Sequence, residues 1–121
     1  MTVLYRVLGR DEWDQAQLLG TVPLCGSDRQ AGWVHLNCPE DVPLVTGRYF
    51  APEQQPVALE LDLAGLESKL EWLAPTAEKN WQQPVLKVPA LQLAWVRAVH
   101  ELTPRRQGRS VHYRFGCAEP V

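Results

Sequence analysis

Residues 28–37 read Asp-Arg-Gln-Ala-Gly-Trp-Val-His-Leu-Asn, and this stretch decides how the fold is interpreted. Its second half, from Trp33 to Leu36, predicts a short β-strand, because aromatic and β-branched residues favour strands. Side chains alternate along a strand, so His35 and Asn37 share one face, about 7 Å apart. A hydrogen-bonded core histidine is the alternative, but this polar pair on an apolar strand favours a ligand-binding face.

The first strand is predicted at Val3 to Leu8, where an apolar run contains one charge. Alternation places Arg6 on the same face as Leu4 and Leu8. A guanidinium buried there must be paired or must point into a pocket, because burying it unpaired is costly. An arginine at a sheet edge with its charged head in solvent is the alternative, and the sequence leaves both open.

The remaining patterns predict two helices in the N-terminal half of the chain. Asp11 caps the first helix, which runs to about Leu19 and ends at Gly20. The second helix runs from Pro39 to about Phe50. Loops or turns are predicted at 21–31, 51–56, 75–84 and 104–108, and strands at 57–62, 69–73, 85–88, 91–99 (or a helix over 91–102) and 111–115. This order indicates an α+β fold with a mostly antiparallel sheet.

The chain has 121 residues and a net charge of −2, which predict one domain and argue against a broad nucleic-acid-coating surface. No apolar run is long enough for a membrane helix, and residues 1–10 lack an export pattern, so a cytoplasmic protein with no membrane partner is expected. We assign residues 1–102, with 8 basic and 13 acidic groups, to a single α+β domain. Residues 103–121 are an Arg-rich C-terminal tail or an extra strand.

The three cysteines, an odd number with no C-x-x-C pair, suit a reducing compartment better than a disulfide scaffold. The cysteines and histidines are scattered without paired-ligand spacing, so no metal is expected. The five tryptophans are expected to fill the core, and Trp33 or Trp81 could instead stack on a planar ligand.

At these residues the chain resembles a family of small bacterial proteins, domain of unknown function 952 (DUF952). The resemblance covers roughly residues 3–100, and its Asp–Gly–aromatic–aliphatic–His–aliphatic–Ser motif corresponds to residues 28–37. The other matching segments are the strand 4–7, the helix 12–16 with Gly20 after it, the unit Arg48-Tyr49-Phe50, the strand 57–62, Leu70 and Trp72.

The chain departs from the family pattern at three positions. Asn37 stands where the family has Ser, Leu73 where a Glu commonly follows the Trp, and Gln83 where the family has the His of Phe-Pro-His. Glu71 and Glu78 are the nearest acidic replacements, and neither is in register. Acid/base chemistry that depends on the family's Glu and His is therefore lost or moved here.

The family is similar to the ADP-ribosyltransferase-like fold, above all to the RNA 2′-phosphotransferases. This resemblance implies a split sheet and a site for NAD or an ADP-ribose derivative. It implies catalytic roles for His35 and Arg6 in ADP-ribosyl or 2′-phospho transfer, and a guanidinium also suits phosphate physically. Whether turnover occurs stays open. Ligand contacts are expected from Arg6, Trp33, His35, Asn37, Trp81 and Gln83.

Two other functions compete with the nucleotide site. The first is a non-enzymatic interaction module on the same fold, with a degenerate site and an unknown protein partner. In that case Arg6 forms an internal salt bridge and His35 is a core residue. The second, less favoured, is RNA contact through the tail, where Tyr113 and Phe115 lie between arginines and could stack on bases. A concave pocket lined jointly by Arg6, His35 and Asn37 distinguishes the nucleotide site from a filled interior.

Overall fold

The computed structural model describes residues 3–121, which form an α+β fold with mostly antiparallel sheets. This confirms the predicted fold class at that level. The first two residues of the predicted domain 1–102 lie outside the described residues. None of the described helices is long and apolar enough to cross a membrane.

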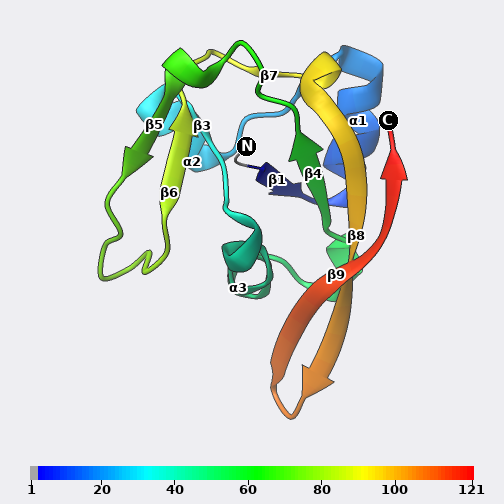
Figure 1. The fold of residues 1–121 in the computed structure, drawn as a ribbon. Coiled ribbons are helices and arrows are strands. Elements are labelled where there is room, and N and C mark those ends of the chain that lie inside the picture. Colours follow the sequence, from blue (N-terminus) through cyan, green and yellow to red (C-terminus); the bar gives the residue numbers. More distant parts are fainter. Residues whose placement is uncertain (1–2) are drawn as a thin grey trace.

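The main sheet has the strand order β1-β4-β8-β9 (Figure 1). Its strands are β1 (Leu4–Leu8), β4 (Val57–Leu61), β8 (Val96–Gln107) and β9 (Ser110–Pro120). The predictions at β1 and β4 are confirmed to within one residue, because their period-2 apolar patterns are strong local signals. All three strand pairs are antiparallel, and β1 is one edge of this sheet.

A second sheet has the order β3-β6-β5 and lies beside the first (Figure 1). It consists of β3 (Val34–His35), β6 (Gln83–Leu86) and β5 (Leu70–Leu73). Just beyond β3, Asn37 exchanges two backbone hydrogen bonds with Tyr5 of β1, with N–O distances of 2.9 and 2.8 Å. Among the described residues this bridge joins the two sheets, and on either side of it the two sheets are separate.

The predicted loop 21–31 is wrong, because it contains two short elements. β2 (Thr21–Val22) pairs with β7 (Leu91–Gln92), some 70 residues further along the chain. α2 (Gly26–Ala31) begins where the Asp28 carboxylate accepts the N–H of Cys25 at 3.1 Å. The β2–β7 pair depends on a contact between distant segments, whereas the cap of α2 is a local contact that the prediction did not recognise.

The two predicted helices are present. α1 (Arg10–Leu19) ends at Gly20, whose φ of 80° is the left-handed conformation that glycine adopts readily. Its N-cap is Gly9 and not Asp11, because the Glu12 carboxylate accepts the N–H of Gly9 at 3.2 Å. The second helix is α3 (Val42–Tyr49), which follows the 3₁₀ turn η1 (Pro39–Asp41).

Residues 91–121 differ most from prediction. The alternative helix over 91–102 is wrong: β7 is followed by the 3₁₀ turn η4 (Leu93–Trp95) and then by β8. The predicted turn at 104–108 is also wrong, since Pro104 lies inside β8 opposite Tyr113. Proline is tolerated there because β8 pairs with β4 only as far as Glu101, so its later part behaves as an edge strand. The turn is at Gly108, which has a φ of 63°. Two further 3₁₀ turns are η2 (Pro52–Gln54) and η3 (Glu67–Lys69).

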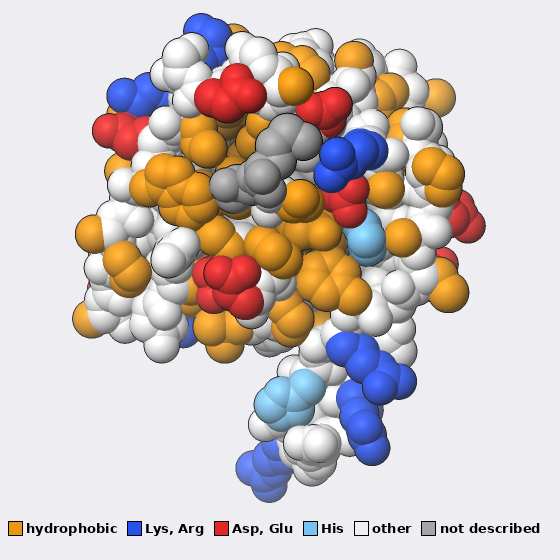
Figure 2. Space-filling view, viewed as in Figure 1, with side chains coloured by type: hydrophobic (Ala, Val, Ile, Leu, Met, Phe, Trp, Pro, Cys, Tyr) orange, Lys and Arg blue, Asp and Glu red, His pale blue; other side chains and the backbone are white. Residues whose placement is uncertain are grey.

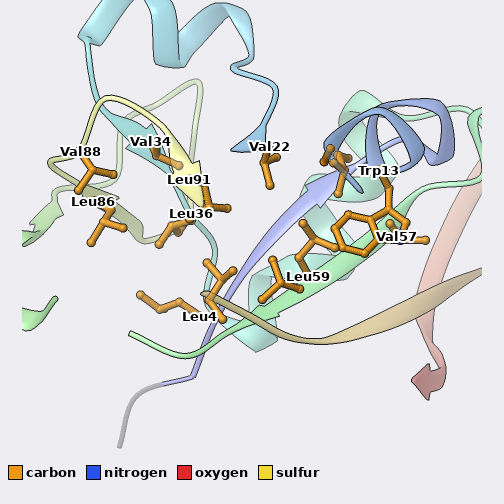
Figure 3. Close-up of a cluster of buried hydrophobic side chains, with 14 of the residues drawn as sticks. Leu4, Trp13, Val22, Val34, Leu36, Val57, Leu59, Leu86, Val88 and Leu91 are labelled. Carbon is orange, nitrogen blue, oxygen red and sulfur yellow. The ribbon is translucent and has the colours of Figure 1, made fainter. Parts of the chain in front are cut away.

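The core is divided by β1, as its alternating side chains predict. Leu4 and Leu8 join the larger apolar cluster with α1 and the second sheet, whereas Tyr5 and Val7 join a smaller cluster on the other face. Figure 3 shows Leu4 and Leu59 among the side chains of the larger cluster. Arg6 shares a face with the two leucines, and its charge must therefore be neutralised inside the protein.

Truncating the centre of this core is expected to cost far more than truncating an exposed leucine. Leu59 is 0% exposed and Leu18 is 87% exposed. We expect Leu59→Ala to lower the free energy of unfolding by about 2–5 kcal/mol and Leu18→Ala to change it by less than about 0.5 kcal/mol. Urea unfolding at pH 7 measures both values, and equal effects of the two substitutions would contradict the described core.

Candidate functional site

A cavity of about 380 Å³ lies beside β1, on the edge where β1 meets Asn37. β1, α2, β3, α3 and β6 all contribute to its wall. The predicted site residues that line it are Arg6, His35, Asn37, Trp81 and Gln83. The concave pocket that distinguishes a site from a filled interior is therefore present, and its volume is within the usual range of small-molecule sites.

The edge of β1 presents backbone groups to this cavity. Hydrogen bonds leave an antiparallel strand on alternate sides, and those of Tyr5 point away from β4, toward Asn37. The N–H and C=O of Val7, two residues further on, point the same way, and Val7 lines the cavity. In residues 3–121, neither the backbone hydrogen bonds outside the strand pairs nor the side-chain bonds at the cavity wall include Val7. Val7 therefore offers an adjacent backbone donor and acceptor to a ligand.

Arg6 is 6% exposed and is paired with Asp28, whose side chain is fully buried. The guanidinium donates from Nη2 to Oδ2 at 2.6 Å and from Nη1 to Oδ1 at 3.3 Å. Nη1 also donates to the backbone oxygen of His35 at 2.7 Å. The sequence left open whether the guanidinium of Arg6 is buried or has its charged head in solvent. In the structure it is buried and paired with Asp28. Its charge is already matched by a carboxylate.

The same carboxylate orients His35. Asp28 Oδ1 accepts the backbone N–H of His35 at 2.9 Å and lies 2.9 Å from its Nδ1. An ionised carboxylate can only accept, so Nδ1 carries a hydrogen, and in the neutral form of the ring Nε2 is the acceptor. The ring is partly exposed and lines the cavity. His35 is therefore a fixed hydrogen-bond acceptor, or a proton acceptor, at this site.

The electrostatics of Asp28 follow from these contacts. Burial alone would raise the pKa of Asp28, but hydrogen bonds from His35 and Arg6 and the charge of Arg6 outweigh it. The pKa of Asp28 therefore lies well below its ordinary value, and the carboxylate stays ionised at neutral pH. The pKa of Arg6 is raised by the same pair, against the opposing effect of burial.

Two of the departures from the family pattern lie opposite each other. Leu73 of β5 is the cross-strand partner of Gln83 of β6, so the positions of the family's Glu and His are direct neighbours. Gln83 lines the cavity, and its Nε2 donates to the backbone oxygen of Ala74 at 3.1 Å. Of the two positions only Gln83 lines the cavity, and Leu73 lies beside it in the sheet.

The two candidate tryptophans differ in position. Trp81 lines the cavity but is buried, with the guanidinium of Arg48 5.6 Å from its ring centroid and Tyr49 edge-on at 6.2 Å. Trp33 does not line the cavity, and the Nζ of Lys87 lies 4.7 Å from its ring centroid. Trp81 is therefore a wall of the cavity, and Trp33 lies outside it.

Several residues that line the cavity are not among the predicted ones, namely Glu12, Cys25, Tyr49, Phe50 and Lys79. Neither Glu71 nor Glu78 lines the cavity, and Glu71 pairs with Lys87 at 3.0 Å. Glu12 was visible in the sequence only as a first-turn residue of a helix. No local pattern indicated that this helix begins beside the cavity.

A separate group of potential metal ligands lies at the start of α3. Single ligand atoms of Cys38, Glu40 and Asp41 lie within 4.8 Å of one another. Burial, followed by the two acidic neighbours, raises the pKa of the Cys38 thiol. Glu40 is exposed and acidic side chains often gather in this way without a metal, so the absence of a metal stays an expectation.

Comparisons with known proteins support a family and a fold. The family described as "Protein of unknown function (DUF952)" matches residues 7–97. The X-ray crystal structure of protein CC0527 from Caulobacter crescentus is similar with a TM-score of 0.73 at 24% identity, over 92% of this chain and 93% of that one. The solution NMR structure of CC0527 gives a TM-score of 0.70 at 25% identity, over 92% and 91%. No curated protein sequence matches significantly.

Removing the Asp28 carboxylate leaves the buried guanidinium of Arg6 without its counter-charge, which should destabilise the fold. We expect Asp28→Ala to lower the free energy of unfolding by about 3–5 kcal/mol. The double variant Arg6→Met/Asp28→Leu should lower it by much less than the sum of the effects of Arg6→Met and Asp28→Leu. Glu53→Ala, which breaks the exposed pair with Arg106, is the control and should change stability by less than about 1 kcal/mol. Urea unfolding measures all of these; additivity of the single changes would contradict the coupling.

The same pair predicts acid sensitivity. A carboxyl group with a lowered folded-state pKa contributes stability that is complete above its unfolded pKa, about 3.9, and is lost as the pH falls toward the folded value. Unfolding at pH 7, 5 and 3 should therefore show a steeper loss of stability in the wild type than in Arg6→Met/Asp28→Leu. Parallel pH profiles would show that Asp28 contributes no such stability.

Proposed function

We propose that this chain, which belongs to the DUF952 family, binds a nucleotide-type ligand, NAD or an ADP-ribose derivative, in the cavity beside β1. The observation that carries the proposal is the convergence of Arg6, His35, Asn37, Trp81 and Gln83 on one cavity. An ADP-ribosyltransferase-like fold is part of the same proposal. It is supported by the split between the two sheets, at which the cavity lies.

The cavity chemistry suits a flat heterocycle with polar edges. Val45, Phe50 and Trp81 supply apolar surface. The unpaired N–H and C=O of Val7 match a ligand that has a donor beside an acceptor. The edge of adenine carries such a pair, its exocyclic amine beside N7, and the carboxamide of nicotinamide carries another.

The polar groups suit a ribose and a phosphate. His35 presents Nε2 as an acceptor, and the amide of Asn37 supplies both a donor and an acceptor for hydroxyl groups. Lys79 lines the cavity and forms no ion pair within residues 3–121, so it is the cation that we assign to phosphate. Arg6 is held by Asp28 and acts as a positioning residue for the His35 wall.

Transfer chemistry is the more demanding form of the proposal. In ADP-ribosyl transfer the ribose–nicotinamide bond breaks, nicotinamide leaves, and an acceptor hydroxyl bonds to the ribose carbon while His35 Nε2 takes its proton. The developing positive charge needs a carboxylate nearby, and among the described residues Glu12 is the carboxylate that lines the cavity. Glu12 also caps α1, and so we assign binding first and turnover second.

A non-enzymatic interaction module is the second candidate. Two observations favour it: the charge of Arg6 is neutralised within the domain, and the paired positions of the family's Glu and His are Leu73 and Gln83. In this case the partner is a protein and not a small molecule, and the cavity is a degenerate site that no longer binds a ligand.

The first experiment measures thermal unfolding with and without ~1 mM NAD, ADP-ribose or 2′-phosphorylated ADP-ribose. A ligand with a dissociation constant near 10 μM stabilises the fold by about 2.7 kcal/mol, which is a rise of several degrees in Tm. We expect this rise in the wild type, its loss in His35→Ala and Asn37→Ala, and its retention in the control His112→Ala, where the replaced histidine is exposed on the hairpin.

The outcomes separate the candidates. Stabilisation that depends on His35 and Asn37 supports the nucleotide site, and release of nicotinamide from NAD by that protein then demonstrates transfer or hydrolysis. No stabilisation by any of the three ligands would overturn the nucleotide proposal and favour the interaction module.

A further inference from the structure

The distal half of the β8–β9 hairpin forms a two-stranded arm, defined here as residues 103–116, whose base packs on the body and whose tip extends beyond it (Figure 1). The arm contains four arginines and no acidic residue, whereas the rest of the chain has eight basic and fourteen acidic residues. Figure 2 shows these basic side chains gathered on the arm below the body. The protein is thus electrically divided into a cationic ribbon and an anionic body.

The register of the hairpin separates the two faces of the arm. Arg105 pairs with His112 and Thr103 pairs with Arg114, and side chains opposite each other share a face. The other face carries Tyr113, which is buried and donates its hydroxyl hydrogen to the backbone oxygen of Phe50 at 3.0 Å. One face therefore packs toward α3, and the face with Arg105, His112 and Arg114 points to solvent.

The arginines of the arm are largely unpaired. The ion pair described there joins Arg106 to Glu53 at 3.5 Å, and both side chains are exposed. Within residues 3–121 no carboxylate pairs with Arg105, Arg109 or Arg114. Four neighbouring positive charges repel one another, and an anionic partner would relieve this repulsion.

We propose that the arm is a DNA-binding ribbon that enters the major groove of duplex DNA and contacts phosphates through its arginines. The B-form major groove is about 12 Å wide and 8.5 Å deep and accommodates a two-stranded β-ribbon. Strands in a ribbon lie about 4.8 Å apart, which leaves room for arginine side chains to reach phosphates on both walls. The anionic body keeps the rest of the protein away from the duplex.

Other anionic partners fit the arm less well. Single-stranded nucleic acids bind to exposed aromatic side chains, but Tyr113 is buried and Phe115 packs on Tyr5 and His100, with ring centroids 5.3 and 5.4 Å apart. The burial of Tyr113 and the packing of Phe115 thus do not favour the expected stacking on RNA bases. Duplex RNA has a major groove too narrow for a ribbon. The tip, residues 107–110, has no apolar side chain to insert into a lipid surface.

The test is fluorescence anisotropy of a labelled 20-base-pair DNA duplex titrated with the full chain. Three phosphate contacts, from Arg105, Arg109 and Arg114, predict a slope of about −2.7 for log K against log salt, roughly a fortyfold loss of affinity between 50 and 200 mM salt. Arg105→Ala/Arg114→Ala should weaken binding at least tenfold and lower the slope by about 2. The control Arg29→Ala/Lys69→Ala removes the same charge from exposed positions of the body and should not weaken binding.

Three results would overturn the proposal. The first is no binding of the duplex at 50 mM salt, with circular dichroism confirming a folded protein. The second is that Arg29→Ala/Lys69→Ala weakens DNA binding as much as Arg105→Ala/Arg114→Ala does. That result would mean that binding depends only on the net charge of the protein. The third is binding of single-stranded DNA or duplex RNA as tight as that of duplex DNA, which would show that the groove plays no part.

Discussion

The buried carboxylate of Asp28 is the constraint on which the centre of this structure depends. It accepts two hydrogen bonds from Arg6, two from His35 and one from the backbone of Cys25. These donors come from β1, β3 and the start of α2. An ionised group without solvent must satisfy its lone pairs inside the protein, so the three segments can be assembled only in one arrangement. The same hydrogen bonds hold His35 in place in the cavity wall.

A second constraint is the narrow junction between the two sheets. Tyr5 and Asn37 exchange one pair of backbone hydrogen bonds, and beyond them the strands diverge. Divergence leaves the backbone of Val7 without a partner strand at the cavity. An open edge normally invites association with another strand, but here the edge faces the cavity. The same geometry that interrupts the sheet therefore turns backbone groups of β1 toward the cavity.

The charge distribution separates this site from the hairpin. At the cavity, the charge of Arg6 is matched by Asp28, so the site depends on directed hydrogen bonds more than on net charge. On the arm the opposite holds, because its arginines have few acidic neighbours and act over several ångströms through their summed field. A small ligand with polar edges suits the first environment, and a polyanion suits the second. The two surfaces can thus serve different partners on one small chain.

The sequence by itself determined the local geometry: the alternation that puts Arg6 among leucines, the common face of His35 and Asn37, and the end of α1 at Gly20. It did so because side-chain periodicity and left-handed glycines depend on a few neighbouring residues. Only the tertiary structure decided that Arg6 is paired, that Glu12 and Lys79 reach the cavity, and that Pro104 lies in a strand. Those outcomes depend on contacts between segments far apart in the chain. Burial and pairing belong to such contacts, and no local pattern specifies the partner.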